Sequence, residues 1–346
     1  MPDRILPAAT LAFALSWSAG AAAQNLDITR PEVQRFIAGL SEREGMERDA
    51  IGVILRDAVP QKSIIELMSR PAERTLAWWE YRQRFLTKER IAAGLALWEQ
   101  QRVPLERIAR ERGVPPEYLL AITGVETYFG RTMGRHRVLD ALATLAFDYP
   151  PRSGYFAREL EQYLLLARDE HIDPRKPLGS YAGAMGAPQF MPTSLRNFAV
   201  DGDGDGHRDL WGSWPDVFAS IANYFVQHGW QPGEPVLAEA TAPATPDDPA
   251  TVPLTLSDTV ESLRRRGYVF ETSLAADARA MPVPAQLQEG LVWRVGFQNF
   301  YTITRYNRSA LYAMAVHELA QALGARRRAA QRGAAGVAPG QIAPAS

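Results

Sequence analysis

Residues 115–130 read PPEYLLAITGVETYFG, a segment in which apolar residues recur at helical spacing behind two prolines. Proline is favoured in the first turn of a helix, and glycine commonly follows the last turn. The segment therefore predicts a helix from Pro116 to about Phe129, with Gly130 as its stop. Near its end stands Glu126, and positions 119, 122, 123 and 126 share one face of such a helix.

The face that carries Glu126 is mainly apolar, so its carboxyl group is expected to point toward buried surroundings. Burial disfavours the anion and raises the pKa, which keeps a carboxyl group protonated near neutral pH. A protonated carboxylic acid in a cleft can donate a proton to a glycosidic oxygen. The alternative is a structural carboxylate paired with Arg131 or Arg135, and spacing alone favours this alternative.

Helical spacing continues on both sides of this segment. Residues 29–112 repeat apolar side chains at steps of three and four, and the stretches 138–147 and 155–167 do the same. A further helix is expected at 217–228, closed by Gly229. The chain is therefore predicted to be mostly helical.

The composition changes after Trp230. Residues 239–253 are rich in Ala, Pro, Thr and Asp, which is typical of a loop, and residues 252–295 alternate short apolar runs with turn residues. Helical character returns at 309–323, and Ala, Gly, Pro and Arg dominate from Arg326 onward. We therefore expect an α+β, predominantly helical fold with a small β-containing lobe and a disordered tail at 326–346.

The first 23 residues have the features of a signal peptide. Arg4 precedes an apolar run, and Ala21-Ala22-Ala23 supplies the small residues of a cleavage site, although Asp3 weakens the positive start. The run is too short to span a bilayer. We expect cleavage after Ala23 and export to the periplasm, the alternatives being an uncleaved anchor or a disordered apolar tail.

Bulk composition excludes several classes of protein. The net charge of -1 gives no basis for binding nucleic acid or an anionic membrane. The absence of cysteine rules out disulfides, thiolate metal sites, a cysteine nucleophile and a lipidated N-terminal cysteine. We also find none of the glycine-rich, zinc-binding or serine-nucleophile motifs that mark nucleotide-binding or hydrolase sites.

Residues 179–194 read GSYAGAMGAPQFMPTS and combine small residues with polar ones. Small residues at such spacing let a backbone approach a ligand or another segment closely. Ser180 and Gln189 place hydrogen-bonding groups beside this approach. A ligand-facing loop and a tight helix crossing that serves packing alone are both compatible with the pattern.

Residues 201–206 read DGDGDG, which places carboxylates at loop positions one, three and five and glycine at six. This is the opening of an EF-hand-type calcium loop, with Asp201, Asp203 and Asp205 as side-chain ligands and the carbonyl of His207 at position seven. Gly212 occupies position twelve, where a glutamate is usual, so Asp216 is the candidate to close the site. The alternative is a solvated acidic turn, but three unneutralised acids would repel one another. We predict a structural Ca²⁺ and no cofactor for chemistry.

Several of these segments together resemble the membrane-bound lytic transglycosylase B family. The resemblance is carried by 124–130 (GVETYFG), 139–145 (LDALATL), the 179–192 and 201–211 segments, 222–225 (ANYF), 228–230 (HGW), 294–301 (RVGFQNFY) and 304–307 (TRYN). The matches run in one order from about residue 30 to 324.

The resemblance implies a lysozyme-like catalytic core around a glycan groove, with a helical N-terminal region and a small β-containing lobe. It divides the chain into a signal peptide at 1–23, an N-terminal helical region at 24–112, a catalytic core with the EF-hand-like loop at 113–235, a β-containing lobe at 236–295, a return to the core at 296–325 and a tail at 326–346.

The resemblance also implies the activity. Such enzymes cleave the β-1,4 bond between N-acetylmuramic acid and N-acetylglucosamine of peptidoglycan without hydrolysis, ending in a 1,6-anhydromuramoyl product. Carried over by position, Glu126 matches the catalytic acid. The positions that match groove residues or sugar contacts are Ser180, Gln189, Arg152, Tyr155, Tyr224, Tyr306, Asn307 and Tyr312.

The resemblance further places the 201–216 loop on the family's calcium loop, with Asp216 as its last acidic ligand. Pro151 stands where some relatives carry a second arginine beside Arg152, which puts contacts with the peptide stem in doubt. Without a cysteine for lipidation, we expect a soluble periplasmic monomer. Its expected partner is the peptidoglycan glycan strand, with cell-wall synthesis or remodelling proteins as further candidates.

No second carboxylate is assigned, whereas ordinary glycosidases use two. We expect Glu126 to act as acid and then as base, with Tyr306 and Asn307 holding the substrate's N-acetyl group. Three alternatives are a hydrolytic muramidase, a non-catalytic peptidoglycan-binding protein and a calcium-binding interaction protein.

Overall fold

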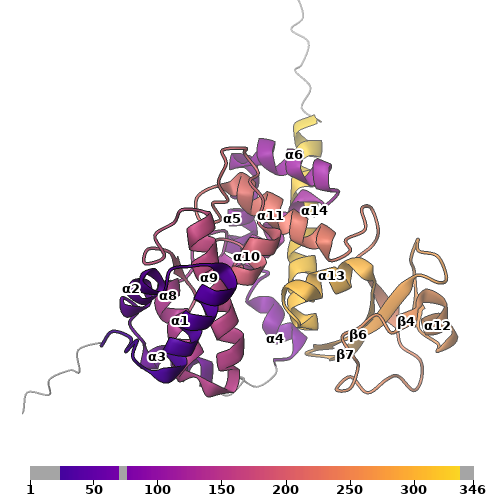
Figure 1. Ribbon diagram of the computed structural model, residues 1–346. Coiled ribbons are helices and arrows are strands. Elements are labelled where there is room, and N and C mark those ends of the chain that lie inside the picture. Colours follow the sequence, from indigo (N-terminus) through magenta and orange to yellow (C-terminus); the bar gives the residue numbers. More distant parts are fainter. Residues whose placement is uncertain (1–23, 70–75, 336–346) are drawn as a thin grey trace, which may run out of the picture.

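The computed structural model describes residues 24–69 and 76–335 (Figure 1). The predicted signal peptide lies outside these residues. The predicted class, α+β and predominantly helical, is confirmed. Within the described residues no helix is long and apolar enough to cross a bilayer.

The N-terminal region is helical, as predicted. Its helices pack their apolar stripes inward, as the buried residues Leu40, Ile51 and Leu97 show. The elements are α1 (Pro31–Glu44), α2 (Arg48–Arg56), α3 (Lys62–Ser69), α4 (Trp78–Gln83), α5 (Lys88–Gln100) and α6 (Arg102–Arg112).

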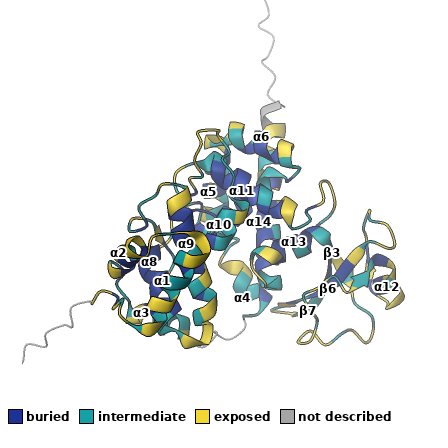
Figure 2. Cartoon of the chain, viewed as in Figure 1, coloured by how far each residue is buried: buried dark blue, intermediate teal, exposed yellow. Residues whose placement is uncertain are grey.

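The central part of the chain contains the 115–130 segment, which carries Glu126. Its elements are α7 (Pro116–Thr127), β1 (His136–Arg137), α8 (Val138–Asp148), the short 3₁₀ helix η1 (Pro150–Arg152), α9 (Ser153–Asp169), β2 (Leu178–Gly179), α10 (Pro192–Phe198) and α11 (Trp214–Gln227). Helix α8 is buried from Val138 to Ala146, whereas α9 and α11 also carry exposed residues (Figure 2).

Helix α7 is buried along most of its length and contacts α5, α6, α11 and the C-terminal helix α14 (Ala310–Ala335). It ends two residues before the predicted limit of Phe129. Tyr128 and Phe129 both have left-handed backbone conformations, with φ of 51° and 59°, and the N–H of Phe129 donates to the carbonyl of Thr123 at 2.9 Å. This closing turn fixes the end of the helix that carries Glu126.

The predicted β-containing lobe is a five-stranded antiparallel sheet in the order β4-β6-β7-β3-β5. Met281, Val283 and Ala285 on one face join the main core, whereas Trp293 and Val295 belong to a second, smaller core. The elements of this part are β3 (Leu237–Thr241), β4 (Asp258–Thr259), α12 (Val260–Arg265), β5 (Val269–Phe270), β6 (Arg279–Leu287), β7 (Gly290–Gly296) and α13 (Gln298–Tyr306).

The expected disordered tail from Arg326 is wrong for its first ten residues. Helix α14 continues to Ala335, and only 336–346 lie outside the described residues. Alanine and arginine are good helix formers. In addition, Arg327 pairs with Glu99 at 2.7 Å and lies over the ring of Trp98, and Arg328 lies 3.8 Å from Glu117. These contacts hold the helix end against α5 and α7.

Candidate active site

Glu126 lies in the last turn of α7 and is partly accessible. Its Oε1 accepts a hydrogen bond of 2.6 Å from the hydroxyl of Tyr312, which is buried in the first turn of α14. The contact joins residues 186 positions apart in the chain. It holds the carboxyl group in one orientation.

Burial raises the pKa of Glu126 to about 7, and the hydrogen bond from Tyr312 opposes this rise. The causes of the shift include neither an arginine nor a second carboxylate. Within the described part of the chain, Arg131 lies over the ring of Tyr128 and Arg135 is exposed, and neither pairs with Glu126. The structure thus favours a proton-donating carboxyl group over a structural ion pair.

Two further tyrosines form a cluster with Tyr312. The ring of Tyr306 lies parallel to that of Tyr312 at 6.4 Å, and its hydroxyl donates to the carbonyl of Pro188 at 2.7 Å. Tyr224 packs edge-on against Tyr306 and donates to the carbonyl of Arg305 at 2.6 Å. Since Tyr224 is 8% exposed, it supports Tyr306 from behind and offers little surface to a sugar.

The 179–192 loop packs against the end of α7. Thr127, next to Glu126, donates to the carbonyl of Ala187 at 2.9 Å. The Gln189 side-chain nitrogen donates to the carbonyls of Met133 (3.1 Å) and Gly186 (2.9 Å), which leaves its amide oxygen as an acceptor. Gln189 has a φ of 54°, a strained conformation typical of functional sites.

Ser180 closes the other end of this loop. Its hydroxyl oxygen accepts from the N–H groups of Ala182 (3.2 Å) and Ala184 (3.0 Å). The hydroxyl proton remains available as a donor. Ser180 therefore stabilises a turn through its hydroxyl oxygen and can still donate a hydrogen bond through its hydroxyl hydrogen.

The remaining predicted groove residues are not all in the Glu126 cluster. Arg152 lies over the ring of Tyr155 at 4.6 Å, at the start of α9, and within the described residues neither of them makes a hydrogen bond or ion pair with Glu126. Asn307 is exposed directly after Tyr306. Their contacts with a glycan stay predictions.

Tyr81 is a residue near the site that the sequence pattern did not indicate. It lies within the 29–112 stretch of apolar side chains at helical steps, where a structural aromatic is expected. In the fold Tyr81 lies on α4, and the charge of Glu126, after burial, contributes to raising its pKa. Its place depends on long-range packing, so spacing gave no signal for it.

The acidic loop gathers three of its predicted ligands. Carboxylate oxygens of Asp201, Asp203 and Asp205 lie within 4.8 Å of one another. Backbone N–H groups of Gly204 and Gly206 donate to Asp201 at 2.6 and 2.8 Å. An all-oxygen donor set of this kind fits a hard cation such as Ca²⁺. His207 follows in the loop, where its carbonyl is the predicted seventh-position ligand.

Asp216, the predicted last ligand, lies beneath the loop with both carboxylate oxygens hydrogen-bonded. It is 1% exposed, and its two oxygens accept from the N–H groups of Gly202 and Asp209, both at 2.7 Å. It is not among the three gathered carboxylates. These hydrogen bonds brace the loop, and the role of Asp216 as a ligand stays a prediction.

The acidic loop is attached to the 179–192 loop. The N–H of Ala187 donates to the carbonyl of Leu210 at 2.8 Å, and the indole nitrogen of Trp211 donates to the carbonyl of Leu178 at 3.0 Å. The first contact comes close to Gln189 and the second to Ser180. The acidic loop therefore supports the part of the site that contains Gln189 and Ser180, which we call the polar side of the site.

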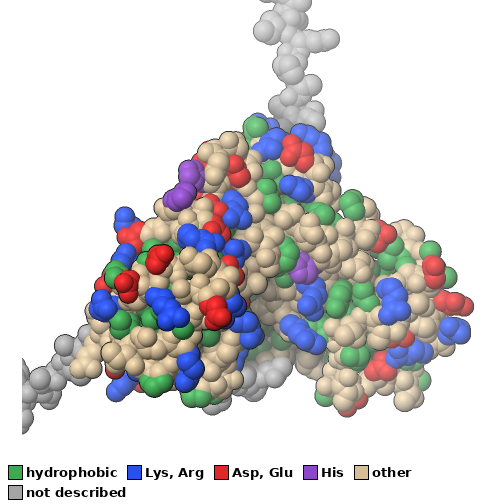
Figure 3. Space-filling view, viewed as in Figure 1, with side chains coloured by type: hydrophobic (Ala, Val, Ile, Leu, Met, Phe, Trp, Pro, Cys, Tyr) green, Lys and Arg blue, Asp and Glu red, His purple; other side chains and the backbone are tan. Residues whose placement is uncertain are grey.

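The surface of the molecule has a hollow near its centre (Figure 3). In the space-filling view the surface is hollowed between the N-terminal helices and the sheet lobe, where Figure 1 shows α4 (Figure 3). Arginine or lysine side chains lie along its sheet-lobe side (Figure 3).

Known proteins are similar to this chain in both sequence and fold. The sequence pattern of the Transglycosylase SLT domain matches residues 29–321. The chain is 41% identical over 304 residues to the membrane-bound lytic murein transglycosylase B of Escherichia coli K12, covering 85% of this chain and 82% of that protein.

Solved structures of lytic transglycosylases are similar to this chain in fold. Lytic transglycosylase SltB1 of Pseudomonas aeruginosa matches with a TM-score of 0.82 and 43% identity, over 86% of this chain and 98% of that one. The Escherichia coli lytic transglycosylase Slt35 in complex with calcium gives 0.79 and 40%, over 88% and 96%.

A more distant relative was solved with a peptidoglycan fragment. SltB3 of Pseudomonas aeruginosa in complex with NAG-anhNAM-pentapeptide gives a TM-score of 0.74 and 29% identity, over 85% and 77% of the two chains. The family pattern spans most of the chain described above, including α7 and the tyrosines around Glu126. The chain belongs to the lytic transglycosylases that act on peptidoglycan and is an enzyme of that family.

Proposed function

We propose that Glu126 is the single acid and base of this transglycosylase. Its carboxyl proton passes to the glycosidic oxygen, and the bond from that oxygen to C1 of the muramic acid breaks. The carboxylate then takes the proton of the C6 hydroxyl, whose oxygen bonds to C1 and closes the 1,6-anhydro ring. The products are a free N-acetylglucosamine end and an anhydromuramoyl end, with no water consumed.

The observation that carries this proposal is a carboxyl group with a pKa of about 7 and no second carboxylate among the causes of that shift. A pKa near the working pH suits a group that must give and then accept a proton. The hydrogen bond from Tyr312 stabilises the anionic form between the two transfers. The exposed Asn307 and neighbouring Tyr306 are the candidates to hold the acetamido group that supports C1.

Product analysis tests the reaction type. We expect mass spectrometry of digested sacculi to find muropeptides that end in 1,6-anhydromuramic acid, lighter than reducing ends by one water. Reducing muramic ends would instead identify a hydrolytic muramidase, and undigested sacculi would favour a binding protein. We also propose that the enzyme is exported to the periplasm and acts there as a monomer on glycan strands.

We propose further that the 201–207 loop binds a structural Ca²⁺. Three exposed or half-exposed carboxylates lie within 4.8 Å, a charge density that a cation neutralises. Slt35, which shares this fold, was solved in complex with calcium.

Calcium is expected to raise the melting temperature without changing the activity of the folded enzyme. Binding to the folded state alone stabilises it by about 2.7 kcal/mol at a free concentration one hundred times the Kd. Thermal melts in millimolar calcium and in chelator measure this gain. Asp203→Asn should abolish the response, whereas Asp248→Asn, outside the loop, should keep it. Equal melting temperatures in calcium and chelator would contradict the site.

A further inference from the structure

A second buried carboxyl group lies outside the cluster of Glu126 and its tyrosines. Glu159, on α9, is 5% exposed, and within the described residues no lysine, arginine or histidine lies in ion-pair range of it. Glu159 is not among the causes of the raised pKa of Glu126. Burying a carboxylate without a counter-ion is costly unless hydrogen-bond donors surround it. The donors around Glu159 therefore indicate what this residue is for.

One donor comes from the end of the 179–192 loop. The N–H of Thr193 donates to Oε2 of Glu159 at 2.9 Å. Thr193 is the second residue of α10, which follows the loop directly and packs against α9. Three residues before Thr193, the ring of Phe190 lies 5.8 Å from that of Tyr306. Glu159 thus fixes the loop at the point where it leaves the tyrosine cluster.

The other donor is Tyr155, one turn earlier on the same face of α9. Burial raises the pKa of Tyr155, and the charge of Glu159 and its hydrogen bond with the Tyr155 hydroxyl add to this rise. Arg152 lies over the ring of Tyr155 at 4.6 Å. The half-buried ring of Tyr155 is therefore held at two points, by Glu159 at its hydroxyl and by Arg152 on its face.

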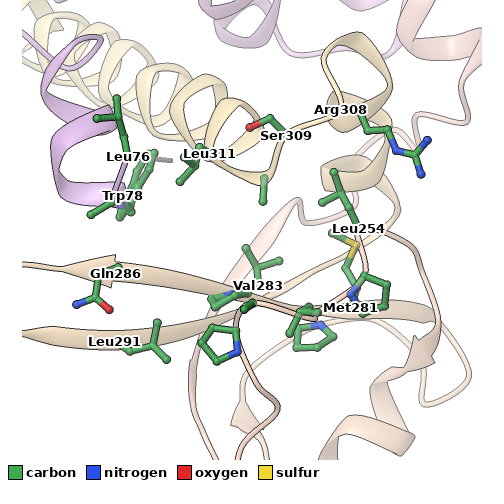
Figure 4. Close-up of a pocket in the computed structure, with 18 residues that line it drawn as sticks. Leu76, Trp78, Leu254, Met281, Val283, Gln286, Leu291, Arg308, Ser309 and Leu311 are labelled. Atoms are coloured by element: carbon green, nitrogen blue, oxygen red, sulfur yellow. The ribbon is translucent and has the colours of Figure 1, made fainter. Parts of the chain in front are cut away.

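These contacts lie away from the cavity between α4, β6 and the start of α14. That cavity has a volume of about 450 Å³, and Trp78, Met281 and Leu311 are among its lining residues (Figure 4). No residue of α9 lines it, and α9 and β6 lie on opposite sides of α4 (Figure 1). An effect of Glu159 on the substrate must therefore act through Tyr155 and the loop.

We propose that Glu159 is a positioning residue of the glycan groove, which holds the ring of Tyr155 and the end of the 179–192 loop in one fixed arrangement. Sugar contacts at Tyr155 and at Gln189 then keep a constant separation, although they come from different elements. The inference rests on the proposed glycan site at Glu126, with Tyr155 as one of its sugar contacts. Glu159 touches no substrate itself, so its loss should weaken binding of the strand and leave proton transfer at Glu126 in place.

A carboxyl group that served the fold alone would behave differently. If Glu159 only capped the first turn of α10 through Thr193, its loss would lower the melting temperature and leave KM unchanged. The contact with Tyr155 predicts a change in KM as well, because the ring loses the acceptor that fixes its hydroxyl. KM and kcat together therefore separate the two roles.

Glu159→Met removes both acceptor oxygens and fills the buried space with a side chain of similar length. We expect KM for soluble, uncrosslinked peptidoglycan strands to rise about tenfold, since a hydrogen bond to a charged group is worth about one factor of ten. The value of kcat should stay within about twofold of the wild type. Tyr155→Phe, which removes the hydroxyl alone, should raise KM too, and the double variant should have the KM of Glu159→Met.

Glu161→Met is the matched control. Glu161 lies two residues later on α9 and pairs with Arg43 of α1, so its KM should stay within about twofold of the wild type. The proposal is overturned by an unchanged KM in Glu159→Met, by an equal rise in Glu161→Met, or by additive effects of Glu159→Met and Tyr155→Phe. If Glu159→Met does not fold, Tyr155→Phe decides alone, because an unchanged KM in that variant also overturns the proposal.

A binding measurement separates this inference from the assignment of Glu126. Calorimetry with the same strands and the Glu126→Gln variant does not depend on catalysis, and adding Glu159→Met to that variant should weaken binding about tenfold. Equal binding with and without Glu159→Met would overturn the role of Glu159 and leave Glu126 untouched. A Glu126→Gln enzyme that still cuts the strands would overturn the catalytic assignment alone, since the KM values would still test Glu159.

Discussion

Glu126→Gln is expected to leave the enzyme folded and to lower its turnover of peptidoglycan at least about a thousandfold. The amide keeps the size of the side chain and can still accept the hydrogen bond from Tyr312. It cannot donate a proton to the leaving oxygen or take one from the C6 hydroxyl, and positioned acid-base groups contribute about 10²–10⁴ in rate. Release of muropeptides from sacculi, with melting temperature as the fold check, measures the effect.

The control for this substitution lies on the same helix. Glu117→Gln removes a carboxylate at the start of α7 that lies 3.8 Å from Arg328. Its activity should stay within about twofold of the wild type, because surface pairs of this kind contribute little. Substantial residual activity in Glu126→Gln would mean that another group transfers the proton.

The same assignment fixes the direction of the pH dependence. The first step needs the protonated form of Glu126, whose pKa burial raises to about 7 from an ordinary value of 4.5. The value of kcat/KM should therefore be level below this pKa and fall about tenfold per pH unit above it. A carboxyl group with an ordinary pKa would already be deprotonated well below neutral pH.

Local patterns predicted the parts of the site that lie within one segment. The periodicity of 116–129 placed Glu126 on a buried helix, and the spacing of Asp201, Asp203 and Asp205 gathered three carboxylates. Each depends on residues a few positions apart, which backbone geometry relates directly.

The same local patterns could not predict contacts between segments that are distant in the sequence. The hydrogen bond from Tyr312 to Glu126 spans 186 residues, and the approach of Tyr81 depends on how α4 packs. The helical course of 326–335 depends in part on the contact of Arg327 with Glu99, 228 positions earlier. Spacing made Asp216 a candidate ligand, but only the fold shows the hydrogen bonds that it accepts from the backbone of Gly202 and Asp209.

Gly134→Ala is expected to destabilise the fold by at least about 3 kcal/mol, because its backbone has a φ of +102° and a Cβ there would lie 2.0 Å from the carbonyl oxygen of Gly179. That oxygen belongs to backbone and cannot rotate away. The clash also separates Met133 from Gln189 and disturbs the residue before Ser180, so activity should fall even in the folded fraction.

Comparison with Gly233→Ala separates the steric clash in Gly134→Ala from the energetic cost of placing alanine in a left-handed backbone conformation. Gly233 also has a positive φ, +79°, but nothing lies within 4 Å of a Cβ at this position. Its substitution should therefore carry only the left-handed penalty of about 1 kcal/mol and leave activity intact. Urea unfolding of both variants at unchanged m-value measures the difference. Equal midpoints would show that the segments at Gly134 and Gly179 can move apart freely, and that this close approach does not hold the polar side of the active site.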